Sequence, residues 1–283
     1  MAITSCFRVR DALDAYLARI GFEGEALPNL ATLRELHRLH VEAVTFENID
    51  VQLGTPVSRN PRAAFRKIVV QGRGGWCFES NGLFAFMLEA IGFRVQRLAA
   101  GVMREKMGAA AVGNHLALAV KLDRTYLCDV SVGVGLVEPA PLVEGPLRQG
   151  FKRLALERVG GGWWRLHNHP GAVPASFDFS LEVTDEALLD EKSRWLEKDP
   201  ASPFVCNAIA QRHFPDRLES LVGRTHSVLT AEGERVEEVE SAEEYARLLR
   251  DVFQLQIRDV APLWARVSRA SGADFLASLD LAA

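Results

Sequence analysis

The spacing of apolar residues predicts helices through the first third of the chain. Leu13, Tyr16, Leu17 and Ile20 recur at the interval of one helix face, and Gly21 is suited to end that helix. Apolar stripes of the same period predict three further helices, over residues 30–41, 61–70 and 77–91. The sequence up to residue 91 therefore predicts a helical bundle.

After residue 92 the pattern changes to short apolar stretches that are typical of strands. The clearest predicted strands cover residues 95–102, 115–122 and 125–130, and weaker ones cover 151–156, 163–167 and 177–183. The helical period returns at 184–196, and the rest of the chain predicts strands at 218–222 and 226–229 and helices at 241–252 and 261–270. Strands that follow a run of helices favour an α+β or multi-domain chain over a doubly wound parallel sheet.

Composition narrows the class of protein. The chain has 283 residues, of which 48% are hydrophobic and 25% charged, as in soluble globular proteins. A net charge of −4 gives no general nucleic-acid footprint, and the sequence has neither a signal peptide nor an apolar stretch long enough to span a membrane. The four widely separated cysteines, at positions 6, 77, 128 and 206, form no zinc or disulfide pattern. We expect a cytoplasmic protein with reduced thiols that binds neither nucleic acid nor membrane.

The motif richest in candidate chemistry is the run Arg73-Gly74-Gly75-Trp76-Cys77, which leads into a predicted helix. Paired glycines allow either a positive φ or a close backbone approach. A cysteine at a helix N-terminus meets the positive end of the helix dipole and free backbone N–H groups, which favour the thiolate. A buried cysteine after an ordinary turn is the alternative. Because the glycine pair and the arginine suit an electropositive, partly exposed site, we favour a nucleophile.

A cysteine nucleophile needs a base, and the base needs an orienting group. His115 begins one predicted strand, and Asp129 lies near the end of the next. With a two-residue turn at Asp123-Arg124, residue 115 faces residue 132, which leaves Asp129 three positions from direct opposition to His115. A longer turn or a bulge brings the two side chains within reach. Cys77, His115 and Asp129 are therefore the predicted catalytic residues.

Each partner also has a structural interpretation. A lone histidine at a strand start is usually hydrogen-bonded within the fold, and an aspartate at a strand end usually caps a turn. His37 and His40, on an early predicted helix, compete for the role of base. His167 and His169 suggest a metal, but no third ligand stands near them in the sequence, so we predict no metal site.

Taken together, these motifs resemble those of the arylamine N-acetyltransferase family. The matching segments follow one another in the family's order: residues 16–21, 46–50, 73–81, His115, 129–130 with Gly133, and 202–204. The cysteine motif is highly specific, and an ordered set of this kind does not arise by chance. The resemblance implies that Cys77, His115 and Asp129 form a catalytic triad.

The resemblance also implies an α+β multi-domain fold with a cysteine-protease-like Cys-His-Asp core. Residues 1–91 would form the helical bundle that carries the nucleophile, 92–190 a central antiparallel β-barrel with the histidine and aspartate, and 191–283 an interdomain helix and a C-terminal α/β lid. The implied reaction belongs to xenobiotic metabolism. It is a ping-pong transfer of acetyl, through an acetyl-cysteine, from acetyl-CoA to a small aromatic amine, hydrazine or N-hydroxyarylamine. Acetyl-CoA is then a donor substrate, and no permanently bound cofactor is expected.

The family's pattern further suggests residues for contact with substrate or CoA: Phe46, Trp76, Val132, Gly133 and Phe204. The sequence departs from this pattern after the triad aspartate, where Ser131-Val132-Gly133 replaces glycine, aromatic, glycine. Val132 implies a wider or differently shaped acceptor pocket, and Ser131 places a side chain where the pantetheine of CoA would pass. Arg73 is expected to hold the loop through an ion pair with Glu47.

Three other functions stay open. An amide synthase or another N-acyltransferase of secondary metabolism would use a different acyl thioester, as the Ser131-Val132 pair suggests. A thiol hydrolase of the papain or transglutaminase kind would use the same three residues to cleave amides without CoA. A catalytically inactive binding protein would lack a readily alkylated Cys77.

Overall fold

The computed structural model describes residues 8–131 and 133–269. The predicted N-terminal helices are confirmed as α1 Val9–Ile20, α2 Leu30–Ala43, α4 Pro61–Phe65 and α5 Cys77–Ile91. Asn29 and Asn60 cap α2 and α4, and Gly21 and Gly92 end α1 and α5 with a positive φ. Three short elements complete this region: strand β1 Phe46–Glu47, helix α3 Ile49–Gln52 and the π-helical turn η1 Arg66–Val70.

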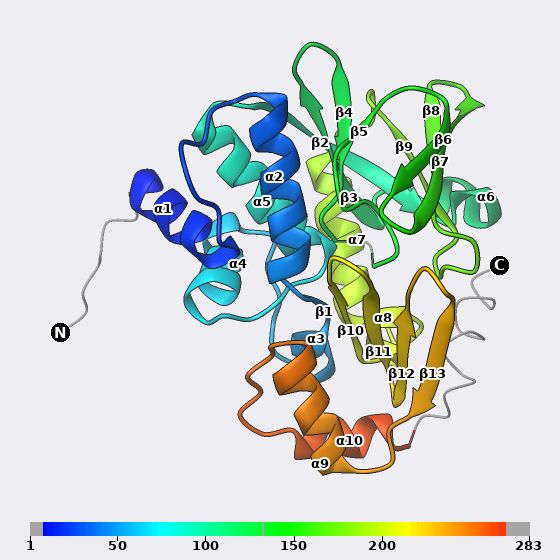
Figure 1. Ribbon diagram of the computed structural model, residues 1–283. Coiled ribbons are helices and arrows are strands. Elements are labelled where there is room, and N and C mark those ends of the chain that lie inside the picture. Colours follow the sequence, from blue (N-terminus) through cyan, green and yellow to red (C-terminus); the bar gives the residue numbers. More distant parts are fainter. Residues whose placement is uncertain (1–7, 132, 270–283) are drawn as a thin grey trace.

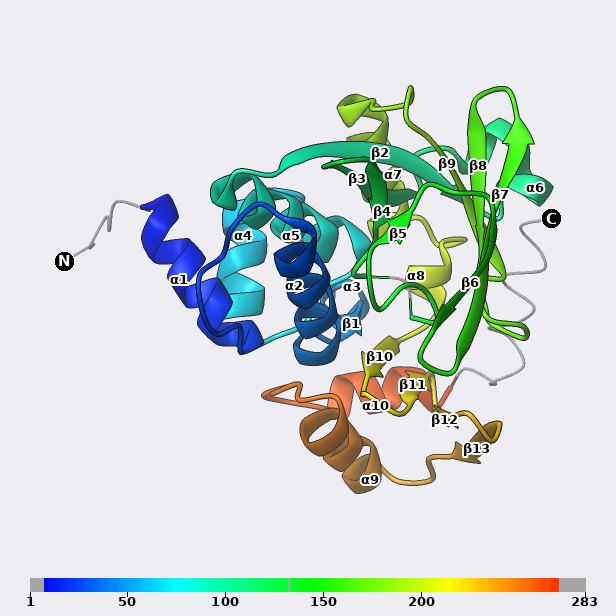
Figure 2. The same ribbon diagram turned by 45° about the horizontal axis from the view of Figure 1, so that its top comes forward.

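Eight antiparallel strands form one sheet in the order β5-β4-β3-β2-β9-β8-β7-β6, and this sheet curls into a nearly closed barrel (Figures 1 and 2). The strands are β2 Arg94–Val102, β3 His115–Lys121, β4 Thr125–Cys128, β5 Ala140–Pro141, β6 Gly145–Gln149, β7 Lys152–Gly160, β8 Trp163–His167 and β9 Ser176–Ser180. Helix α6 Arg104–Met107 and the 3-10 turn η2 Gly108–Ala111 connect β2 to β3. The six strands predicted between residues 95 and 183 are all present, with β8 at its predicted bounds and the others with shifted ends.

A second sheet has the order β1-β10-β11-β12-β13, so its first strand comes from the N-terminal region. Its other strands are β10 Ile209–His213, β11 Leu218–Val222, β12 Thr225–Leu229 and β13 Glu234–Glu238. The surrounding helices are α7 Glu186–Lys198, α8 Pro203–Cys206, α9 Ala242–Arg247, the π-helical turn η3 Leu248–Val252 and α10 Ala261–Val267. The acidic stretch after residue 232 is an exposed strand, β13, followed by the first turn of α9.

Figure 1 shows α1, α2, α4 and α5 on one side of the molecule, the barrel on the other, and the second sheet with α9 and α10 below them. Strand β3 separates the helices from the interior of the barrel, because its side chains point alternately to the two sides. Leu116, Leu118 and Val120 join the apolar cluster of the helices, whereas Ala117 and Ala119 join the cluster inside the barrel. A third apolar cluster underlies the second sheet. Strand β1 brings this sheet beside residues 73–77, the cysteine turn, through a bridge between Phe46 and Gly75.

The pairing register of β3 and β4 differs from the predicted one by one residue. Lys121 pairs with Thr125 and Leu118 with Cys128, so the turn contains three residues instead of the two that were expected. Because side chains alternate between the faces of a strand, one residue of slip exchanges the faces. Extending the observed register places residue 131 opposite His115. Asp129 is then two positions from direct opposition and on the same face of the sheet as His115.

Candidate active site

The cysteine turn needs its two glycines for close backbone approach, since neither has a positive φ. A Cβ on Gly74 would lie 2.1 Å from the Thr45 carbonyl oxygen and 2.7 Å from Glu47 Cγ. Gly75 forms a parallel bridge with Phe46, in which Glu47 N–H donates to Gly75 O at 3.1 Å and Gly75 N–H donates to Thr45 O at 3.1 Å. The glycine pair therefore seats the turn directly on β1.

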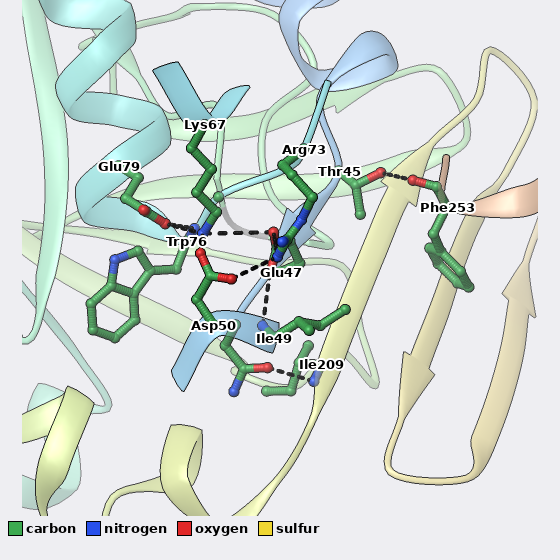
Figure 3. A network of polar contacts seen from close by, with 12 residues as sticks. Thr45, Glu47, Ile49, Asp50, Lys67, Arg73, Trp76, Glu79, Ile209 and Phe253 are labelled. Carbon is green, nitrogen blue, oxygen red and sulfur yellow. Dashed lines mark hydrogen bonds and ion pairs between the residues drawn. The ribbon is translucent and has the colours of Figure 1, made fainter. Parts of the chain in front are cut away.

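Arg73 fastens the start of the same turn, as predicted. Its Nη2 lies 2.8 Å from Glu47 Oε1 and 3.0 Å from Asp50 Oδ1 (Figure 3). Burial lowers the pKa of Arg73, but the two carboxylates raise it above its ordinary value, so the guanidinium stays charged. Glu47 is fixed in turn, because its Oε2 accepts the Ile49 N–H at 2.7 Å.

Cys77 is the first residue of α5, directly after the N-cap residue Trp76. The thiol is buried, with 3% of the residue exposed, and it lies where the first-turn N–H groups and the helix dipole favour negative charge. The thiol also lies close enough to the imidazole of His115 to raise the pKa of that ring. The turn thus presents the sulfur to a base, which is the arrangement expected of a cysteine nucleophile.

His115 and Asp129 form a buried pair in which His115 Nε2 lies 2.7 Å from Asp129 Oδ2. Burial lowers the pKa of His115, but the charge and hydrogen bond of Asp129, together with the contact to Cys77, raise it to about 10. The imidazole therefore carries a proton at neutral pH, and an imidazolium beside a cysteine stabilises the thiolate. The structure thus brings together Cys77, His115 and Asp129, the three residues predicted to be catalytic.

The carboxylate of Asp129 is held by Asn81 and Ser131, neither of which was predicted to support the triad. Asn81 Nδ2 donates to Asp129 Oδ1 at 2.8 Å, and Asn81 Oδ1 accepts the Val130 N–H at 2.9 Å. Ser131 donates to the same Oδ1 through its backbone N–H at 3.0 Å and its hydroxyl at 3.1 Å. Burial raises the pKa of Asp129, but His115 and these donors lower it overall, so the carboxylate stays ionised. The available signal for Asn81 was a polar residue in a mostly apolar helix, four residues after Cys77.

Ser131, whose side chain was predicted to stand where the pantetheine of CoA would pass, contacts the triad carboxylate and lines the same small cavity as Phe46 and Gly133. Its side chain is buried, and its hydroxyl oxygen lies 2.6 Å from Asn81 Nδ2 as well as close to Asp129. His37, one of the competing histidines, also reaches the site. Its Nε2 accepts the Asp129 N–H at 3.1 Å, and burial lowers the pKa of His37 to about 4, so it is a neutral acceptor.

The residues suggested for substrate contact lie around the cysteine turn. The ring of Phe204, on α8, has its centroid 5.5 Å from that of Trp76 and 6.4 Å from that of Phe46. Phe46 and Gly133 line one small cavity, and a Cβ on Gly133 would meet the side chain of Gln211. Val132 lies outside the described residues.

The described residues contain no group of three or more histidine, cysteine or acidic side chains arranged to hold a metal ion. His167 Nε2 instead lies 2.6 Å from Glu157 Oε2, and His169 Nδ1 accepts the Arg153 N–H at 3.2 Å. Over residues 8–131 and 133–269, no helix has the length and hydropathy needed to cross a bilayer.

Comparison with known proteins gives the following similarities. A family model described as N-acetyltransferase matches residues 29–261. The arylamine N-acetyltransferase of Mycolicibacterium smegmatis is 31% identical over 88% of this chain and 94% of its own length. The arylamine N-acetyltransferase / N-hydroxyarylamine O-acetyltransferase of Salmonella typhimurium is 30% identical over 88% of this chain and 90% of its own length. The structure of the Mycobacterium marinum arylamine N-acetyltransferase in complex with CoA superposes with a TM-score of 0.82 and 29% identity, covering 91% of this chain and 98% of that one.

Proposed function

The chain belongs to the arylamine N-acetyltransferase family and is an acyltransferase, and we propose that it carries acetyl from acetyl-CoA to an arylamine, arylhydrazine or N-hydroxyarylamine on Cys77. The observation that carries this proposal is the buried imidazole of His115, which lies 2.7 Å from the Asp129 carboxylate and close enough to Cys77 for the thiol to raise the pKa of the imidazole. The same three side-chain types in this order of contact activate a cysteine for acyl transfer.

In the first half-reaction, the Cys77 thiolate attacks the carbonyl carbon of the acetyl-CoA thioester. The tetrahedral intermediate collapses when the bond from carbon to the CoA sulfur breaks, and the His115 imidazolium gives its proton to the departing sulfur. The backbone N–H of Cys77 and that of a neighbouring residue stabilise the oxyanion at the N-terminus of α5. One thioester replaces another, so this step is close to balanced in free energy.

In the second half-reaction, the amine nitrogen attacks the acetyl carbon on Cys77. His115 takes the proton that the nitrogen loses, and the bond from the acetyl carbon to Cys77 Sγ breaks to release the thiolate and the amide. Aromatic amines are largely unprotonated at neutral pH, so their nitrogen is available for attack. Asp129, held by Asn81 and Ser131, keeps the imidazole oriented through both steps.

Substrate contacts are part of the proposal. Phe46, Trp76 and Phe204 supply aromatic surface beside Cys77, and Val132 and Gly133 follow the triad aspartate in the sequence. A relative of this chain is solved in complex with CoA, which supports acetyl-CoA as the donor. We also place the protein in the cytoplasm, which suits the free cysteines at 77, 128 and 206.

Release of CoA from acetyl-CoA, measured at several concentrations of an arylamine such as an aniline, tests this function. We expect release that depends on the amine, and parallel double-reciprocal lines that indicate a ping-pong order. Release at the same rate without amine would instead identify a thioester hydrolase. A strong preference for longer acyl thioesters over acetyl-CoA would identify the amide synthase type of acyltransferase.

A further inference from the structure

Five charged side chains lie together, largely buried, beneath the cysteine turn (Figure 3). Three are carboxylates and two are cations: Glu47, Asp50, Glu79, Lys67 and Arg73. Lys67 Nζ lies 2.9 Å from Asp50 Oδ2, 2.9 Å from Glu79 Oε2 and 3.6 Å from Glu47 Oε1. Arg73 contacts Glu47 and Asp50, so Lys67 is the cation that holds Glu79.

Such a cluster is costly to bury. The side chains of Lys67, Glu79 and Glu47 are only 9%, 4% and 0% exposed, and water no longer screens or solvates their charges. Replacing buried ion pairs by apolar residues of similar volume often leaves the stability of a protein unchanged or raises it. The contribution of the cluster therefore lies in the geometry that it imposes.

Glu79 connects the cluster to the nucleophile. It is the third residue of α5, and its Oε2 accepts both the Trp76 N–H at 3.3 Å and Lys67 Nζ at 2.9 Å. Trp76 is the N-cap of α5 and Cys77 follows it. A carboxylate in this position fixes the first turn of a helix by capping the N-cap N–H. Glu79 is also packed tightly, because a Cβ on Gly75 would lie 3.0 Å from Glu79 Cβ.

We propose that Lys67 is a positioning residue for the nucleophile, whose ammonium holds Glu79 in its capping orientation so that the first turn of α5 presents Cys77 to His115. This inference rests on the role proposed for Cys77 and adds a cause for its placement. Lys67 reaches the turn from η1, an element separate from β1, α5 and the β3–β4 hairpin. The turn is thereby fixed on two sides. Arg73 binds Glu47 of β1 and Asp50 of α3 on one side, and Lys67 holds Glu79 on the other.

The charge balance explains why the ammonium is needed. The cluster has three carboxylates and two cations, so it carries one surplus negative charge. The charged groups that act on Glu79 are Lys67 on η1, Glu47 on β1 and Asp50 on α3. Burial raises the pKa of Glu79 to about 7, against the lowering effect of Lys67. Without Lys67 the surplus grows, Glu79 takes up a proton, and a neutral carboxyl is a weaker acceptor for the Trp76 N–H.

The test compares Lys67→Met, Glu79→Ala and Glu79→Gln with the wild type. The rate at which iodoacetamide alkylates Cys77, resolved by peptide mass spectrometry between pH 6 and pH 9, reports the presentation of the thiol, and circular dichroism reports folding. We expect Lys67→Met and Glu79→Ala to slow alkylation about tenfold, the scale of a lost helix cap. Glu79→Gln should fall between the wild type and Glu79→Ala, because its neutral amide oxygen still accepts the Trp76 N–H, but more weakly than a carboxylate does. The exposed Lys121→Met is the matched control for loss of a lysine.

A double-mutant cycle separates positioning from simple stabilisation. If Lys67 acts through Glu79, the Lys67→Met, Glu79→Ala double variant alkylates no more slowly than either single variant. Glu79→Ala leaves two carboxylates and two cations in the cluster, so no buried charge is left in excess. This variant can therefore be compared with the wild type even if Lys67→Met does not fold. Folded Glu79→Ala with wild-type alkylation at every pH overturns the inference, whatever its melting temperature. Failure of the proposed function shows separately, as a wild type that takes no acetyl from acetyl-CoA.

Discussion

Replacing Ser131 with alanine removes one hydroxyl from the support of the triad carboxylate. That hydroxyl lies 3.1 Å from Asp129 Oδ1 and 2.6 Å from Asn81 Nδ2, and the residue is 4% exposed. Alanine fits the same space without strain, because the substitution only deletes an atom. The variant therefore tests whether the hydrogen bond itself contributes to the reaction.

The structure limits the size of the effect. A hydrogen bond to a charged group contributes about 1.5–3 kcal/mol. Asp129 Oδ1 keeps two other donors, Asn81 Nδ2 at 2.8 Å and the backbone N–H of residue 131 at 3.0 Å. We therefore expect a net loss of about 1 kcal/mol of stability, with a melting temperature lower by roughly 2–4 °C. Because Asp129 orients His115, we expect acetylation of Cys77 to slow about fivefold to tenfold.

The assay is the single-turnover rate of Cys77 acetylation by acetyl-CoA, measured with the melting temperature of the same samples. Ser80→Ala is the control, since Ser80 is equally buried and donates to Gly75 O at 3.3 Å without contacting Asp129. It should lower stability by a similar amount and change the acetylation rate less. Equal rates for Ser131→Ala and wild type would refute the reasoning, as would equal losses in the two serine variants.

Two further predictions concern the scaffold. Gly74→Ala places a Cβ 2.1 Å from the Thr45 carbonyl oxygen, and we expect about 3 kcal/mol less stability in urea unfolding; an unchanged midpoint would show that the turn does not need its close approach. Lys152→Met removes a buried lysine whose pKa burial lowers to about 7. Between this folded-state pKa and the unfolded-state pKa of about 10.4, the unfolded chain binds more protons than the folded one, so the free energy of unfolding of the wild type rises with pH. The variant should thus gain relative stability as pH falls toward 7, and a difference independent of pH would contradict this.

The sequence predicted the elements whose residues repeat with a clear period. The helices that begin near Val9, Leu30, Pro61 and Cys77 are found at those positions, because apolar spacing and terminal glycine or asparagine residues act locally. Strand β10 escaped prediction, since its five residues alternate poorly and their pairing with β1 is remote in sequence. The domain boundaries at residues 91 and 190 stay predictions.

The candidate site was predictable where a motif or a hairpin joined its residues. The pairing of His115 with Asp129 followed from adjacent strands, although the turn is one residue longer than expected. The contacts of Asp129 with Asn81 and with His37 join residues 48 and 92 positions apart. No local spacing links such residues, so only the folded arrangement of α2, α5 and the hairpin reveals them.

The central claim is that Cys77 carries the acetyl group between donor and acceptor. Mass spectrometry of the intact protein after incubation with acetyl-CoA tests it most directly. We predict a mass gain of one acetyl group that is absent in Cys77→Ser and is lost when an arylamine is added, with formation of the N-acetylarylamine. An unmodified wild type, or an adduct that persists in Cys77→Ser, would contradict the account.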